Sequence, residues 1–171
     1  LQNLKQVMIM NKSKILGLVK LGGFLKTFLS NSPENYTEKE EEFALLLKRS
    51  EVENPWFTQD SLRFSLDSWA QLLTEDLLVD WLSKYPIKDS SKRIGLILAG
   101  NIPMVGWHDV MTVILSQNIP VIKLSSKDRW VIPFLLKFWN DNTEGGIAYE
   151  ITERLENFEA VIATGSNNTA R

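Results

Sequence analysis

The chain contains no cysteine, which excludes disulfide bonds, thiolate metal sites and a cysteine nucleophile within its 171 residues. Histidine occurs once, at His108, so a cluster of histidines cannot bind a metal. No apolar run approaches the roughly 18 residues that a membrane-spanning helix needs. The first residues mix lysines with apolar side chains and lack a small-residue cleavage site, so we expect no signal peptide and a cytoplasmic location.

A strong excess of charge is also absent. The formal net charge is −2, with 44% hydrophobic and 23% charged residues, a balance typical of globular proteins. This balance offers no basic surface for nucleic acid, so we expect no nucleic-acid partner. The length is sufficient for one or two domains with a substantial core.

Residues 1–90 have a helical hydrophobic period, which predicts an N-terminal helical region. Thr37 and Glu40 occupy the positions of a capping box at the start of the second of four expected helices. The loop 54–57 joins two helices, and we expect its aromatic residues, Trp56 and Phe57, to dock it onto the core.

Residues 91–171 have a different pattern, in which short apolar runs alternate with amphipathic segments. The expected strands are 94–99, 119–124, 147–151 and 160–163. The expected helices are 104–117 and 130–139, with a brief helical turn at 152–155. Strands that alternate with helices predict an α/β fold with a parallel sheet.

Three of these strands end in residues that suit ligand binding. The carboxyl ends of parallel strands share one sheet edge, where ligands bind in open α/β folds. The ends carry Gly100-Asn101-Ile102-Pro103, then Lys123 with Ser125-Ser126-Lys127, and finally Thr164-Gly165-Ser166.

Each of these ends has a functional and a purely structural interpretation. The Asn101 amide can donate to an oxyanion, or it can belong to an ordinary strand-to-helix turn. Lys123 can hold a phosphate or ribose, or it can simply extend into solvent. Gly165 and Ser166 can bind a phosphate at a helix start, or form a plain cap. We expect His108 to be a surface residue, and no strand is followed by G-x-G-x-x-G.

As a set, these segments resemble the LuxC-like acyl-CoA reductase family of the aldehyde dehydrogenase superfamily. The resemblance lies in 100–109, 121–128 and 158–171, together with Glu53-Asn54-Pro55-Trp56-Phe57-Thr58, and covers most of the chain from about Asn54 onward. It implies a helical region in residues 1–90. It also implies the first part of a Rossmann-like NAD(P)-binding sheet of the aldehyde dehydrogenase type in residues 91–171.

The resemblance also implies roles for particular residues. Asn101 matches an asparagine of the oxyanion hole, and Lys123 matches a lysine that contacts the adenosine ribose. Gly165 and Ser166 match a pair at the pyrophosphate, and Ser125 belongs to the cofactor-binding turn. Ser126 stands where NAD-preferring relatives often carry glutamate. Because serine does not repel a 2′-phosphate and Lys127 adds a cation, we expect NADPH as the cofactor.

The family's nucleophile is a cysteine beyond the Thr-Gly-Ser segment, and this chain has none. We therefore expect the N-terminal part of a longer enzyme, inactive alone, whose last strand exposes apolar surface and favours homo-oligomers. The implied reaction is the NADPH-dependent reduction of a fatty acyl-CoA thioester to an aldehyde through a cysteine acyl-enzyme. The alternatives are an NAD(P)-dependent aldehyde dehydrogenase that acts oxidatively and a non-catalytic α/β binding module.

Overall fold

A computed structural model describes residues 2–88 and 91–165 of the chain. The N-terminal half is helical, with elements α1 (Gln2–Ser30), η1 (Pro33–Asn35), α2 (Glu38–Glu53), α3 (Gln59–Leu72) and α4 (Glu75–Ser83). The C-terminal half alternates strands and helices in the order β1 (Arg93–Ile97), α5 (Trp107–Leu115), β2 (Ile119–Lys123), α6 (Val131–Asp141), β3 (Glu150–Ile151) and β4 (Ala160–Ala163). None of the helices in the described ranges has both the length and the apolar character needed to cross a bilayer.

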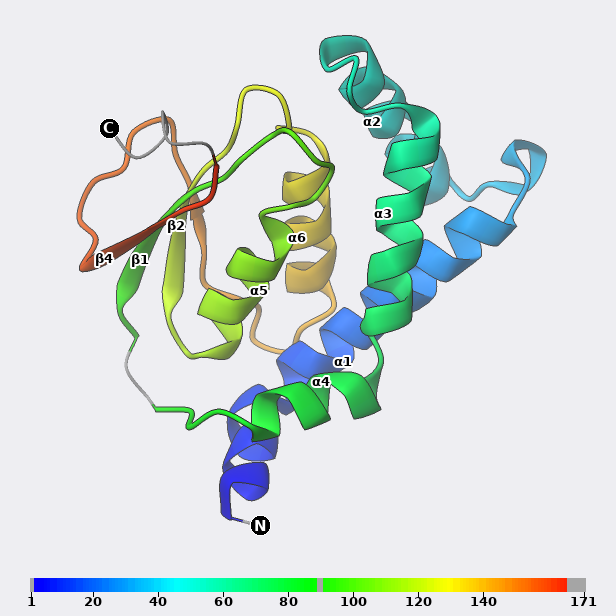
Figure 1. Cartoon of the computed structure of the whole chain (residues 1–171). Coiled ribbons are helices and arrows are strands. Elements are labelled where there is room, and N and C mark those ends of the chain that lie inside the picture. The colour runs from blue at the N-terminus through cyan, green and yellow to red at the C-terminus, as the bar shows by residue number, and fades with distance from the viewer. Residues whose placement is uncertain (1, 89–90, 166–171) are drawn as a thin grey trace.

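The four strands form one all-parallel sheet in the order β3-β2-β1-β4 (Figure 1). The register pairs Ile97 of β1 with Lys123 of β2 on one side and with Ala163 of β4 on the other. The predicted α/β class with a parallel sheet is therefore confirmed. The common register also brings the ends of β1, β2 and β4 to the same level of the sheet.

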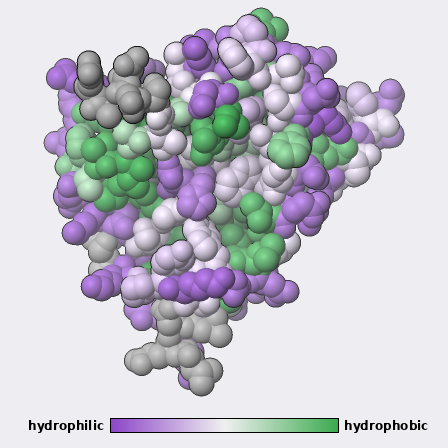
Figure 2. Space-filling model, in the orientation of Figure 1, coloured by the Kyte–Doolittle hydropathy of each residue, from purple (hydrophilic) through white to green (hydrophobic). Residues whose placement is uncertain are grey.

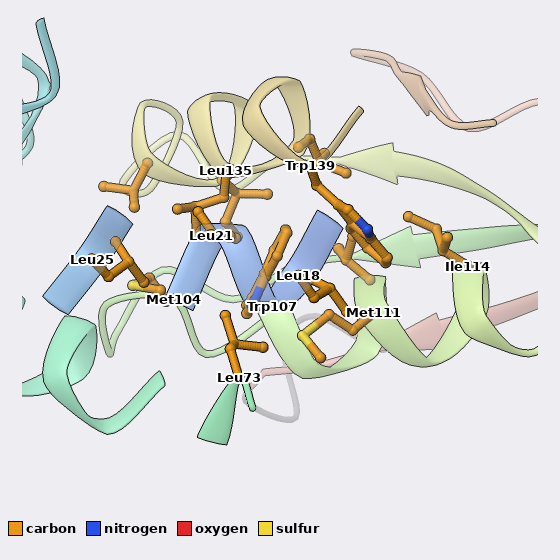
Figure 3. Packing of buried hydrophobic residues seen from close by; sticks show 14 of the residues in the cluster. Leu18, Leu21, Leu25, Leu73, Met104, Trp107, Met111, Ile114, Leu135 and Trp139 are labelled. Atoms are coloured by element: carbon orange, nitrogen blue, oxygen red, sulfur yellow. The ribbon is translucent and has the colours of Figure 1, made fainter. Parts of the chain in front are cut away.

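Helices α5 and α6 lie between the sheet and the N-terminal helices (Figure 1). The long helix α1 packs against α6, and its Leu18, Leu21 and Leu25 point into the shared core (Figure 3). Trp107 of α5 and Trp139 of α6 meet there edge to face, with ring centroids 5.9 Å apart. The buried residues of both halves thus form a single hydrophobic cluster.

The predicted capping box at the start of α2 is confirmed. The backbone N–H of Thr37 donates to Glu40 Oε2 over 2.8 Å, and the Glu40 N–H donates to Thr37 Oγ1 over 3.3 Å. The hydrogen bond from the Thr37 backbone lowers the pKa of the Glu40 carboxyl. Both ends of the motif satisfy N–H groups that the first helical turn leaves unpaired.

Several predicted boundaries are wrong. Helix α5 begins three residues later than expected, because Met104 has a left-handed φ of 61° that a helix cannot contain. Strand β3 has only two residues, since the N–H of Ile147 donates to Asn140 Oδ1 rather than to a neighbouring strand. The helical turn expected at 152–155 is absent, because the Thr152 hydroxyl bonds both the N–H and the carbonyl of Arg154.

Strand β4 forms an edge of the sheet, and all four of its residues are exposed. Val161 and Ile162 leave apolar surface on its two faces, and the space-filling view has an apolar area where the sheet lies (Figure 2). The expected exposure of the last strand is confirmed. A loop that contains Leu155 and Phe158 covers the neighbouring position at Gly95.

Candidate functional site

The three strand ends singled out by the sequence surround one open pocket of about 890 Å³ at the carboxyl edge of the sheet. Its lining includes five of the six predicted site residues, Asn101, Lys123, Ser125, Ser126 and Gly165. The sixth, Ser166, lies outside the described residues. Ligands of open parallel sheets bind at this edge, and the volume falls within the usual range of small-molecule sites, roughly 300–1,000 Å³.

The first turn of the pocket follows β1 and requires glycine at position 100. A Cβ added to Gly100 would lie 2.8 Å from Ser125 Cβ and 3.0 Å from Lys127 Cβ, and closer still to the Ser125 hydroxyl. The glycine thus allows the turn after β1 to contact the turn after β2. The next residue, Asn101, is exposed to the pocket, so its amide is available to a ligand.

The second turn of the pocket, residues 125–128, is closed by its own hydrogen bonds. Ser125 Oγ accepts from the Lys127 N–H over 3.2 Å, and the Ser125 carbonyl accepts from the Asp128 N–H over 3.1 Å. These bonds hold Ser126 and Lys127 at the exposed tip of the turn. Ser125 therefore helps to close the turn, whereas Ser126 is exposed and lines the pocket.

Asp128 fastens the second turn to the first from inside the protein. Its carboxylate is 2% exposed, and Oδ2 accepts from the Met104 N–H over 3.1 Å. Among the described residues, Oδ1 has no hydrogen-bond partner. Burial raises the pKa of Asp128 to about 6, against a smaller opposing effect of the Met104 hydrogen bond. A carboxylate in this position holds the left-handed Met104 in place at a cost in desolvation.

Asn54 is a third link between the two turns, and sequence reasoning missed it as a site residue. Its side chain is 1% exposed, and Nδ2 donates to the carbonyls of Gly100 over 3.0 Å and of Lys127 over 3.2 Å. Its Oδ1 accepts from the Trp56 N–H over 3.1 Å. The only signal in the sequence was its place within Asn-Pro-Trp-Phe, because partners 46 and 73 residues away cannot be read from spacing.

The loop that Asn54 anchors places its two aromatic residues in opposite environments. Phe57 is fully buried in the core, as expected. Trp56 is 78% exposed and lines the pocket, so the expectation that it docks onto the core is wrong. The N–H of Phe57 donates to the Asn54 carbonyl in a tight turn that directs the two neighbouring side chains apart.

Cations outnumber carboxylates on the pocket wall. Lys123, Lys127 and Arg129 line it together with a single carboxylate, Glu153. Arg129 is held by Glu53, to which its Nε and Nη2 donate over 3.0 and 3.1 Å. These hydrogen bonds lower the pKa of Glu53 and raise that of Arg129, so the pair stays charged. Because Glu53 offsets the charge of Arg129, the positive charge that remains on the pocket wall comes from Lys123 and Lys127, and it favours an anionic ligand.

The third turn follows β4 and is tied to α5. Thr164 Oγ1 donates to Asp109 Oδ2 over 2.5 Å, and the Thr164 N–H donates to the Ile97 carbonyl over 3.0 Å. Neighbouring His108 is largely exposed, lies against the Trp81 ring and is not part of the pocket lining. The sequence-based interpretation of His108 as a surface residue is confirmed.

These features define an α/β protein with N-terminal helices, an all-parallel four-stranded sheet and a cationic pocket at its carboxyl edge. No group of His, Asp and Glu side chains within residues 2–88 and 91–165 is arranged to hold a metal ion. No protein-family model matches the chain, and comparisons with curated proteins and with solved structures found no match.

Proposed function

We propose that the chain is the N-terminal part of an NADPH-dependent acyl-CoA reductase of the LuxC-like type, and that the pocket binds the cofactor. One observation carries the proposal. The resemblance assigns site roles to residues that lie far apart in the sequence, and four of them line this one pocket: Asn101, Lys123, Ser126 and Gly165. The aldehyde dehydrogenase type of sheet, with residues 1–90 as a helical region and 91–171 as part of the cofactor domain, belongs to the same proposal.

The chemistry of the pocket suits a phosphorylated nucleotide. Lys123 and Lys127 favour phosphates, and the exposed hydroxyl of Ser126 can donate to a phosphate oxygen. The Glu153 carboxylate can accept hydrogen bonds from ribose hydroxyls. Lys123 would hold the adenosine ribose, Ser126 and Lys127 would face the 2′-phosphate, and Gly165 with Ser166 would meet the pyrophosphate.

In the proposed reaction, a cysteine from outside these 171 residues attacks the thioester carbonyl, and the thiolate of coenzyme A leaves. The Asn101 amide donates to the oxyanion that develops on the carbonyl oxygen, which lowers the barrier of acyl transfer. NADPH, when bound, supplies the hydride for reduction to the aldehyde. The residues described here bind and orient, because this chain has no thiol of its own.

Titration of the full-length protein with each nucleotide, measured by isothermal calorimetry, tests the proposal. We expect NADPH to bind at least about 10-fold more tightly than NADH, as a charge-assisted phosphate contact of about 1.5–3 kcal/mol implies. Ser126→Glu should remove this preference by repelling the 2′-phosphate. Ser32→Glu adds the same charge at an exposed serine outside the pocket and should leave both affinities unchanged.

Thioester turnover with NADPH is measured in parallel. A wild-type protein that binds neither nucleotide would refute the proposed cofactor site. Equal affinity for NADPH and NADH, unaffected by Ser126→Glu, would refute the preference for NADPH. Binding of NADPH with oxidation of free aldehydes but no thioester turnover would favour an oxidative aldehyde dehydrogenase.

A further inference from the structure

Trp56 is a large apolar side chain that the fold holds in solvent at the wall of the pocket. It is 78% exposed, whereas the other five tryptophans of the chain are buried or partly buried. A single exposed aromatic residue needs no special explanation. Trp56 differs from such a residue because it lines the pocket that contains Lys123, Lys127 and Arg129.

The backbone around Trp56 is fixed before any ligand binds. Its N–H donates to Asn54 Oδ1 over 3.1 Å, and the N–H of the next residue, Phe57, donates to the Asn54 carbonyl over 2.8 Å. Buried residues on both sides, Asn54 and Phe57, anchor the loop in the protein interior. A rigid loop that presents an indole loses little conformational entropy when a ligand stacks on it.

The indole also lies next to the cationic turn. The same Asn54 side chain accepts from the Trp56 N–H and donates to the Lys127 carbonyl. It therefore bridges the loop that carries Trp56 and the turn that carries Lys127. Trp56 and Lys127 also line the same pocket, so one ligand can meet both side chains. In a nucleotide the group that adjoins the phosphate is a ribose that carries a flat aromatic base.

We propose that Trp56 is the stacking surface for the adenine ring of the bound nucleotide, while Lys127 faces its phosphate. This inference rests on the proposed function, because it assigns a further residue to the same cofactor site. Indole and adenine rings attract each other when stacked, and the positive charges beside them favour the attached phosphate. The contact gives affinity for adenine nucleotides as a class, whereas the phosphate contacts distinguish NADPH from NADH.

The test uses 2′,5′-ADP, which carries the adenine and the 2′-phosphate, and reduced nicotinamide mononucleotide, which lacks both. Trp56→Ala should weaken binding of NADPH and of 2′,5′-ADP by a similar factor, about 5- to 100-fold, and leave nicotinamide mononucleotide unaffected. Trp56→Phe keeps an aromatic ring and should lose less. Phe64→Ala removes another exposed aromatic side chain, 76% exposed and outside the pocket, and should change nothing.

Fluorescence gives a second, independent measurement. Since Trp56 is the exposed tryptophan, 2′,5′-ADP should protect the acrylamide-accessible fluorescence of the wild type, and this protection should disappear in Trp56→Phe. If 2′,5′-ADP binds Trp56→Ala as tightly as the wild type and gives no protection, the inference is refuted and the proposed cofactor site stands. If the wild type binds neither NADPH nor 2′,5′-ADP, the proposed function is refuted and the inference with it.

Discussion

Replacement of Asn54 tests whether the N-terminal helices help to build the pocket. Asn54→Ala removes both hydrogen bonds from Nδ2 to the Gly100 and Lys127 carbonyls and the acceptor of the Trp56 N–H. Asn54→Asp is nearly isosteric and keeps the acceptor for Trp56. It replaces the donor by a carboxylate oxygen that faces two carbonyl oxygens.

The structure gives the size of each effect. Each lost hydrogen bond contributes about 1 kcal/mol net, and a buried partner left unpaired adds to the loss. We therefore expect Asn54→Ala to lower the free energy of unfolding by about 2–4 kcal/mol. Because the side chain is 1% exposed, Asn54→Asp also buries an unpaired charge, which should raise the loss to about 3–5 kcal/mol at neutral pH.

Urea denaturation followed by circular dichroism measures both losses, with the slope of the transition checked for two-state behaviour. Asn35→Asp, the same change at an exposed asparagine of η1, serves as the control and should shift stability by less than about 0.5 kcal/mol. If Asn54→Asp is as stable as Asn35→Asp, the bridge between the turns contributes nothing and the reasoning fails.

Two further predictions concern the turns themselves. Burial raises the pKa of Asp128 in the folded protein to about 6, from an ordinary value of 3.8. The unfolded state therefore binds fewer protons between these pH values, and stability falls as pH rises through that window, by about 3 kcal/mol in all. Urea denaturation measured from pH 4 to 7 should show this loss of stability in the wild type and not in Asp128→Asn. If the stability of both proteins changes with pH in the same way, the raised pKa of Asp128 is contradicted. Gly100→Ala should destabilise the protein by about 1–3 kcal/mol and weaken NADPH binding, because its Cβ meets the turn 125–128. Gly23→Ala, within α1 and with open space around the added Cβ, should instead be neutral or stabilise by up to about 1 kcal/mol; equal thermal stability of the two variants would refute the packing argument.

Elements with a strong local signal could be predicted from the sequence. The observed bounds of β4 equal the predicted ones, and the Thr37 capping box needs only residues three positions apart. The parallel arrangement followed from alternation, and it brought Asn101, Lys123 and Gly165 to one edge. Local propensity gave the wrong start for α5, because a tertiary hydrogen bond from Met104 to Asp128 holds the preceding turn in a non-helical conformation.

The parts of the site that sequence reasoning missed depend on long-range contacts. Asn54 and Asp128 are ordinary polar residues in a loop and a turn, and only the folded chain shows that both are buried between the two turns. Glu153 reaches the pocket because β3 pairs with β2, which places the following loop beside Lys123. Trp56 was misassigned because the sequence does not show which of two adjacent aromatic residues in a loop, Trp56 or Phe57, turns inward.

The contacts of Asn54 have a consequence for the two halves of the chain. The loop between α2 and α3 supplies Asn54 and Trp56, whereas the sheet supplies the turns that they meet. A ligand that binds only the folded pocket must therefore stabilise both halves, by an amount that grows with the logarithm of its concentration relative to its dissociation constant. The helical region therefore contributes Trp56 to the pocket wall and, through Asn54, holds the turns after β1 and β2 together.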